Sequence, residues 1–125
     1  MKTEITTITI NGIEYVEKTA VNDIKMANKV DGLEYVMCRT YSAGVFAGYL
    51  KMQNGQEVEL LNARRIWSWA GAASLSQLAM EGTSKPNDCK FPIAVEKVIL
   101  TQAIEIIPIT AKAKQSIEGV PVWKK

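Results

Sequence analysis

The chain has 125 residues, of which 47% are hydrophobic and 22% charged, a composition typical of one compact globular domain with its own core. Its formal net charge is only +2, so the overall field does not favour binding to long duplex nucleic acid. There is no histidine, which excludes Ser/His/Asp and Cys/His nucleophilic centres and metal sites that need imidazole. The carboxylates show no spacing that suggests an acid/base pair. We therefore expect a protein that is not an enzyme and that has no metal site, and any anion site must be local.

The two cysteines, Cys38 and Cys89, are too few for a disulfide framework or a four-cysteine zinc site. Buried, unreactive thiols are the expectation for both. The first ten residues, MKTEITTITI, lack the apolar stretch of a secretory signal. No run approaches the roughly eighteen apolar residues of a membrane-spanning helix. The sequence therefore predicts a cytosolic protein with no membrane partner.

Residues 1–125 are expected to form a single domain, with an N-terminal hairpin and connector over 1–32 and a main body over 33–125. Asn11-Gly12 lies between the β-prone runs ITTITI and IEYV. Asn-Gly supplies the positive φ angles of a two-residue hairpin turn, so a hairpin is predicted there. The stretch from Glu17 to Gly32 is polar and predicts a connector with at most a turn or two of helix.

Three β-prone segments follow, LEYVMCRTY, VFAGYLKM and EVELLNARRIWSW. Small-residue and Asn-Gly breaks at Ser42-Ala43-Gly44 and Asn54-Gly55 separate them, which predicts a three-strand meander. The alternation of Glu with Val and Leu in EVEL indicates that the third strand begins with one face exposed and the other buried.

The composition then changes to helix formers in AGAASLSQLAMEG. The pattern Ser74-x-x-Gln77 is a capping box, and it predicts a helix over Leu75 to Glu81. The run VEKVILTQAIEIIPIT predicts one long strand with a bulge or bend at 101–103, and Pro108 places its end at a sheet edge. A frayed turn of helix and an extended segment are expected in the tail. The predicted fold is α+β, with an antiparallel sheet of five to seven strands and one main helix packed against it.

The residues that could recognise a ligand gather in the meander. The only three arginines, Arg39, Arg64 and Arg65, all lie there beside aromatic residues. Arginine presents a planar fork that suits phosphate and also stacks on rings. The segment NARRIWSWAGAASLSQ joins two of these arginines to two tryptophans and a helix N-terminus, which together favour a nucleotide-like anion. Its candidate ligand residues are Asn62, Arg64, Arg65, Trp67, Trp69 and Ser74.

Other interpretations of this segment stay open. Trp67 and Trp69 share one strand face by the period of two, and such a pair also suits a core or a subunit interface. Arg64 and Arg65 point to opposite faces of a regular strand, so at least one of them could serve only a surface salt bridge.

The second cluster is RTYSAGVFAG, whose turn could offer backbone N–H groups to phosphate. Its candidate residues are Tyr41, Ser42, Gly44 and Phe46, with the two rings placed to sandwich a planar group. A bulky residue at Gly44 is then expected to abolish binding while leaving the fold intact. A plain hairpin turn, with the rings packed in the sheet, is the alternative.

The motifs RTYSAGVFAGYL and NARRIWSWAGAASLSQLAMEG, followed by CKFP, VEKVILTQAIEIIPIT and a terminal VPVW, cover about residues 33–123. In these motifs the chain resembles a family of small phage-encoded proteins, and through it the Thoeris anti-defence sponges. The resemblance implies a non-enzymatic protein that binds glycocyclic ADP-ribose, the signal of a bacterial TIR-domain enzyme, in the cytoplasm of the infected host. It also implies homo-oligomers built from dimers, up to a hexamer, with room for separate cyclic di- or trinucleotide sites. No cofactor is implied.

A different class of function is compatible with the same residues. In a structural or protein-interaction module of a phage, the tryptophans would form an interface and the arginines would pair with acidic residues of a partner. The two hypotheses differ in whether the purified protein releases an intact nucleotide when it is heated.

Overall fold

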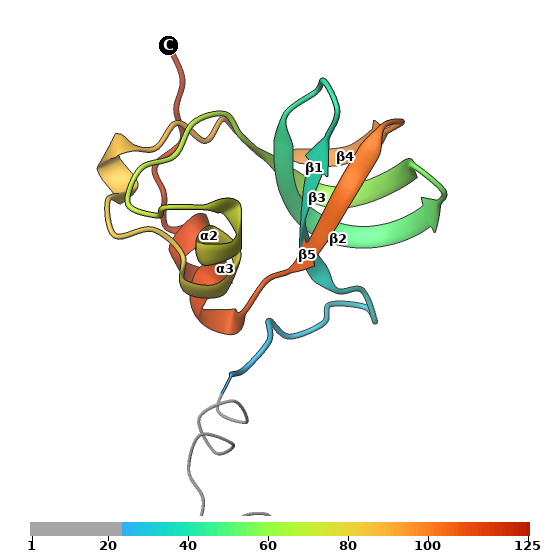
Figure 1. The fold of residues 1–125 in the computed structure, drawn as a ribbon, viewed down its shortest axis with the longest axis horizontal. Coiled ribbons are helices and arrows are strands. Elements are labelled where there is room, and N and C mark those ends of the chain that lie inside the picture. The colour runs from blue at the N-terminus through green and yellow to red at the C-terminus, as the bar shows by residue number, and fades with distance from the viewer. Residues whose placement is uncertain (1–23) are drawn as a thin grey trace, which may run out of the picture.

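The computed structural model describes residues 24–125 and shows a five-stranded sheet beside two α-helices (Figure 1). The hairpin predicted at Asn11-Gly12 lies outside the described residues. The elements are β1 (Tyr35–Thr40), β2 (Val45–Asn54), β3 (Glu57–Ile66), α2 (Leu75–Glu81), the 3-10 helix η1 (Pro86–Asp88), β4 (Val95–Leu100), β5 (Ala103–Pro108) and α3 (Ala111–Glu118). The α+β class, the number of strands and the helix over Leu75 to Glu81 are confirmed.

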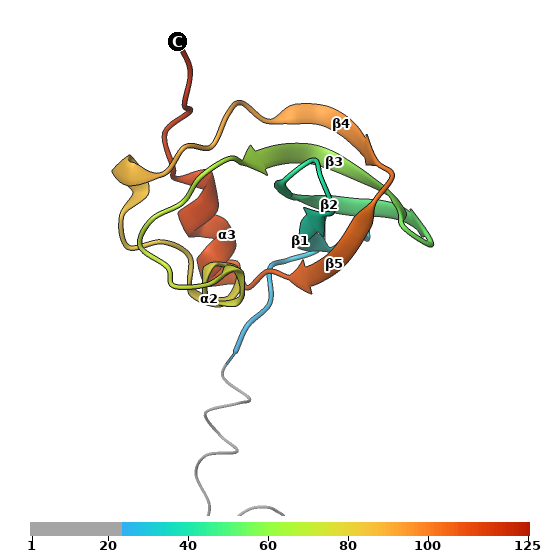
Figure 2. The same cartoon turned by 45° about the horizontal axis from the view of Figure 1, so that its top comes forward.

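The sheet is antiparallel with strand order β4-β3-β2-β1-β5, and it is strongly curled (Figure 2). Its edge strands β4 and β5 follow each other in the chain with only Thr101 and Gln102 between them. The sheet must therefore bend until its two edges meet at this corner. Two hydrogen bonds hold the corner, from Tyr41 N to Gln102 O (2.9 Å) and from Ala103 N to Gln56 O (3.0 Å).

Both faces of the sheet are buried at β1 and at the start of β2, which explains the unbroken apolar run at the start of β1. Tyr35 and Met37 face the helices, whereas Val36 and Cys38 face the inside of the curl. The core between sheet and helices also contains Ala47, Leu78, Phe91, Ala113 and Ile117, and the core inside the curl contains Phe46, Val58, Leu60, Ala63 and Leu100. A strand covered on both faces loses the alternation of a half-exposed strand.

The predicted capping box is present at the start of α2. Ser74 Oγ accepts a hydrogen bond from Gln77 N (3.1 Å), and Gln77 Oε1 accepts one from Ala73 N (2.7 Å). These bonds satisfy N–H groups that have no partner within the helix. The Ser74 hydroxyl therefore serves as the N-cap of α2.

The long run after residue 94 differs from the single strand that its sequence predicts. The break falls at Thr101 and Gln102 as expected, but it separates two strands on opposite edges of the sheet. Because β5 is an edge strand, the expectation for Pro108 is confirmed.

The tail also contains more helix than expected. Helix α3 has eight residues, begins after the N-cap Thr110, and buries Ala113 and Ile117 against the main core. Thr110 Oγ1 accepts from Ala113 N (3.0 Å) and donates to Met80 O (2.7 Å), so the cap also ties α3 to α2. A short polar helix of this kind depends on tertiary packing for most of its stability.

Both cysteine thiols should resist modification in the native protein. Cys38 is fully buried and Cys89 is 7% exposed, and burial raises the pKa of the Cys38 thiol to about 11. Because the thiolate is the reactive form, little of it is present at pH 8. We expect an aromatic disulfide reagent to label neither cysteine in native protein and both in denaturant. Fast labelling of Cys38 in the native state would contradict the buried position.

Candidate functional site

Arg64 is the most heavily bonded side chain of the predicted site. It is 8% exposed, and its guanidinium donates to four backbone carbonyls. Nε reaches Pro92 O (3.0 Å) and Nη1 reaches Ile117 O (2.9 Å). Nη2 reaches both Phe91 O (3.1 Å) and Val120 O (2.8 Å). The Arg64 guanidinium, which the sequence predicts to bind phosphate, is thus already hydrogen-bonded to carbonyls of the protein itself.

The charge of Arg64 is compensated without a carboxylate. Ile117 lies in the last turn of α3 and Val120 follows the C-cap Gly119, at the end of the helix where the carbonyl groups carry the negative end of the helix dipole. Burial lowers the pKa of this guanidinium, but arginine stays charged in proteins. Arg64 therefore joins β3, the segment before β4 and the end of α3 through one buried cation.

Arg65 points to the other face of β3, as the sequence predicts. Its guanidinium lies 4.4 Å from the centroid of the Phe46 ring, and Nη1 donates to Ala43 O (2.5 Å). Phe46 is itself buried at 3% exposure, so its ring is covered rather than free to sandwich a ligand. Arg65 remains partly exposed and keeps further N–H groups for an anion.

Hydrogen bonds to other protein groups fix the turn over Ser42 to Gly44. Ala43 N donates to Thr40 Oγ1 (2.8 Å), and Ser42 Oγ donates to Gln102 Oε1 (3.0 Å). These contacts leave the turn less able to form a phosphate nest than its composition suggests. Gly44 has a φ of +95°, a conformation that costs free energy for any other residue. A bulky residue at Gly44 therefore strains the turn, so the expectation that it spares the fold is not supported.

Arg39 and Tyr41 take no part in the tryptophan segment that follows β3. Arg39 Nε forms an ion pair with Glu105 Oε1 (2.8 Å) across β1 and β5, and both side chains are about half exposed. Tyr41 is 77% exposed and follows directly after β1. Neither is brought to the NARRIWSW segment by the fold.

Trp67 and Trp69 do not share a face, because β3 ends at Ile66. Beyond that point the chain pairs with the segment before β4, and both Trp67 N and Ser68 N donate to Lys90 O (3.1 and 3.2 Å). Trp69 turns inward and packs against the main core. Trp67 turns outward and is 62% exposed.

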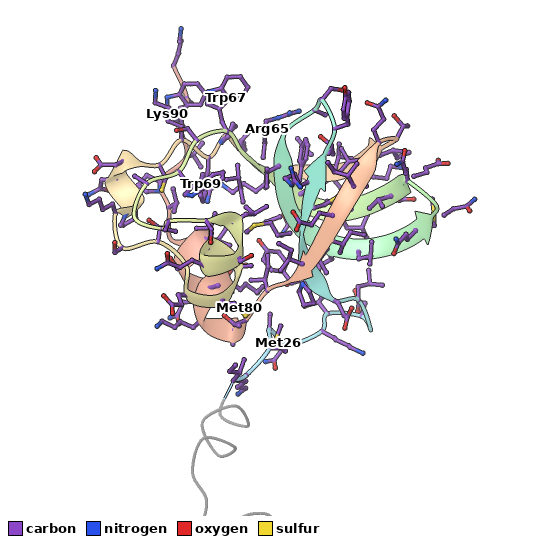
Figure 3. All side chains as sticks on the ribbon, in the orientation of Figure 1. Met26, Arg65, Trp67, Trp69, Met80 and Lys90 are labelled. Carbon is purple, nitrogen blue, oxygen red and sulfur yellow. The ribbon has the colours of Figure 1, made fainter. Side chains whose placement is uncertain are left out.

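The exposed Trp67 has a partner that the sequence did not indicate. Its ring lies nearly parallel to that of Trp123, with an interplanar angle of 13° and centroids 6.3 Å apart. Lys90 Nζ lies 5.6 Å from the Trp123 ring centroid. Figure 3 shows Trp67, Lys90 and Arg65 at the same end of the molecule. We call Trp67, Trp123 and Lys90 the tryptophan surface.

Asn62 lies away from this surface. It has a φ of 49° at an irregularity in the β2–β3 pairing, where Tyr49 pairs with Leu61 and Ala47 with Arg64. Asn62 lines a hollow of about 290 Å³ that also includes Tyr35 and Arg64.

Sequence reasoning missed Lys90 and Trp123. Both lie in motifs that the sequence displays, CKFP and VPVW, but a single lysine or tryptophan carries no periodic signal. Long-range pairing brings them to Trp67. Phe91 and Val122 form an isolated parallel bridge, and Trp123 N donates to Phe91 O (3.0 Å).

Within residues 24–125 there is no group of three or more His, Cys, Asp or Glu side chains that could hold a metal ion. The helices of this part of the chain are all too short or too polar to cross a membrane. The described residues also present an exposed aromatic and cationic surface, and such surfaces suit stacking on a planar group.

A family model described as a domain of unknown function (DUF6948) matches residues 33–117. The chain belongs to this family. The match runs from just before β1 to Ile117 in α3, so it includes Arg64, Trp67 and Lys90, while Trp123 lies beyond it. No curated protein and no solved structure matches the chain.

Loss of Arg64 should destabilise the protein far more than loss of Arg39. Arg64→Ala leaves buried carbonyls without donors and removes packed volume, which we expect to cost about 3–5 kcal/mol in the free energy of unfolding. Arg39→Ala removes a half-exposed ion pair and should cost under about 1 kcal/mol. Denaturant unfolding of both variants measures the difference. Equal losses would show that the carbonyl bonds of Arg64 contribute little.

Proposed function

We propose that this protein binds a nucleotide-type ligand of the cyclic ADP-ribose class and withholds it without cleaving it. This is the anti-defence activity that the resemblance implies, in the cytoplasm of an infected bacterium, with glycocyclic ADP-ribose as the first candidate ligand. The observation that carries the proposal is the exposed, parallel pair of Trp67 and Trp123 with a lysine beside it.

The chemistry of the tryptophan surface suits such a ligand. An exposed indole face offers stacking to an adenine ring, and stacking contributes about 1–3 kcal/mol per base. Lys90 and Arg65, which lie at the same end of the molecule (Figure 3), can supply positive charge to a diphosphate. The sequence predicts phosphate binding by all three arginines. In the proposal Lys90 and Arg65 do so instead, because Arg64 and Arg39 are bonded within the protein.

In a single chain the tryptophan surface is open on one side and does not enclose the ligand. A surface exposed on one side binds more tightly when a second subunit closes over it. The proposal therefore includes a homo-oligomer, a dimer or higher up to a hexamer, with the ligand held between subunits. Separate sites for cyclic di- or trinucleotides belong to the same proposal.

A second candidate function, protein interaction, is favoured by the exposed Trp123 and its chain neighbour Val122, together with Ile93, which lines the same hollow as Val122. Ile93 is 70% exposed and Val122 is 46% exposed. Exposed aromatic and aliphatic groups around a tryptophan are typical of the centre of a protein interface. In this alternative the same surface binds a phage or host protein and no small molecule.

Truncation of Trp67 should weaken nucleotide binding without unfolding the protein. We expect Trp67→Ala to lower the affinity for a cyclic ADP-ribose isomer by about one to two decades, because it removes one stacking face. Isothermal calorimetry measures the affinity, and analysis of heat-released material shows whether the ligand leaves intact. Met26→Ala is the matched control, since it removes an exposed apolar side chain at the opposite end of the molecule from Trp67 (Figure 3).

Failure of every cyclic ADP-ribose isomer to bind the parent protein would reject the nucleotide proposal in favour of protein interaction. Release of an altered nucleotide would instead indicate an enzyme.

Self-association is expected at micromolar concentration. Trp67 and Trp123 form an exposed aromatic pair on a chain of 13.8 kDa, and such surfaces usually mark an interface. Light scattering should give a mass at least twice that of the chain, and Trp67→Ala should lower it. A parent protein that stays monomeric at about 50 μM, a concentration at which even modest dimers form, would contradict the closed site.

A further inference from the structure

The hollow of about 290 Å³ beside the C-terminal segment is separate from the tryptophan surface. Val122 lines the hollow, whereas its neighbour Trp123 stacks on Trp67. Consecutive residues of an extended segment point to opposite sides. The C-terminal segment therefore presents one side to each of two different sites.

Two buried polar side chains in the lining keep unused hydrogen-bonding capacity. Tyr35 is 5% exposed, and among residues 24–125 its hydroxyl has no hydrogen-bond partner. Arg64 is 8% exposed and uses four N–H groups on carbonyls. Because a guanidinium has five N–H donors, one on Nη1 is left. A buried polar group without a protein partner costs free energy unless water or a ligand satisfies it, which makes this hollow a candidate binding site.

The charged groups of the lining already have partners within the protein. Glu118 lies in the lining and pairs with Lys114 Nζ (3.1 Å) on α3. Because Lys114 compensates Glu118 and four carbonyls surround the Arg64 guanidinium, a charged ligand would find no free opposite charge to pair with. A zwitterion would need a free arginine fork for its carboxylate, and Arg64 has only one N–H left. The remaining class is an uncharged group with both an acceptor and a donor.

The groups around Tyr35 support a neutral hydroxyl that donates. Burial raises the pKa of Tyr35, and the negative charge of Glu118 raises it further, while Arg64 opposes the shift. Both charges therefore act on the hydroxyl, in agreement with the position of all three residues around one hollow. At neutral pH the hydroxyl is protonated and can donate to a carbonyl oxygen.

We infer that this hollow binds a flat, uncharged amide or lactam, whose carbonyl oxygen accepts from Tyr35 and Arg64 and whose N–H donates to Glu118. The apolar side chains of Ile93, Ala94 and Val122 cover the ring. The volume is at the lower limit of small-molecule pockets, about 300 Å³, so one ring enters rather than a whole dinucleotide. The site is independent of the proposed function, because none of these residues belongs to the tryptophan surface.

The test uses the full chain and small probes of matched size. Benzamide and 2-pyridone carry the amide and the lactam, while benzoate, benzylamine and phenylglycine carry a negative charge, a positive charge and both. In protein-observed NMR titrations we expect the two neutral probes to shift the amide signals around Ala94 and Val122. Their Kd should be on the order of 1–10 mM, as for good fragments, and at least about tenfold lower than for the charged probes.

Tyr35→Phe is the deciding variant, and Tyr49→Phe is its matched control. The two rings are neighbours with centroids 5.0 Å apart, but only Tyr35 lines the hollow. Tyr35→Phe should weaken benzamide about tenfold and leave the melting temperature unchanged or higher, since its hydroxyl has no partner to lose. Tyr49→Phe should leave benzamide binding unchanged.

Three results would overturn the inference. The first is the absence of binding by both neutral probes, which would mean that only water fills the hollow. The second is equal or tighter binding of a charged probe. The third is a Tyr35→Phe protein that melts at a much lower temperature or binds benzamide like the parent. None of these results bears on nucleotide binding at the tryptophan surface, so the two proposals fail separately.

Discussion

The buried guanidinium of Arg64 is the contact on which the rest of the structure depends. It brings carbonyls from two distant segments, 91–92 and 117–120, to one point on β3. A cation can be buried there because several carbonyl dipoles replace its water and the C-terminal end of α3 adds negative potential. A lysine would keep the charge but has three donors on one atom, too few and too close together to reach all four carbonyls.

The position of the tryptophan surface follows from this contact. Phe91 O accepts from Arg64 Nη2 and also from Trp123 N. The arginine thus fixes the carbonyl that holds the C-terminal segment, and that segment carries Trp123 to Trp67. Lys90, one residue before Phe91, is held by a separate antiparallel bridge to Ser68. A structural arginine therefore positions Trp123 without touching a ligand.

The features that could be predicted from the sequence are those set by neighbouring residues. The helix over Leu75 to Glu81 follows from its capping box, and the breaks at Ser42 to Gly44 and at Gly55 follow from residues that tolerate positive φ. The opposite faces of Arg64 and Arg65 follow from the period of a strand. Each of these depends on a few consecutive positions.

The features that could not be predicted depend on distant parts of the chain. The carbonyls that Arg64 binds lie 27 to 56 residues away, and every residue has a carbonyl, so no side-chain motif marks them. The shared face expected for Trp67 and Trp69 is absent because backbone pairing with Lys90 ends the strand at Ile66. The split of the last strands likewise depends on the closure of the curled sheet and not on the local run of β-branched residues.

The C-terminal segment contributes one residue to the tryptophan surface and another to the hollow. The two candidate sites are therefore linked through this segment, yet they can be altered separately. They are linked because Val122 and Trp123 are neighbours on a segment anchored through Phe91 to Arg64, so a change at Arg64 displaces both sites. They are separable because Lys90 contacts only the tryptophan side and Tyr35 only the hollow.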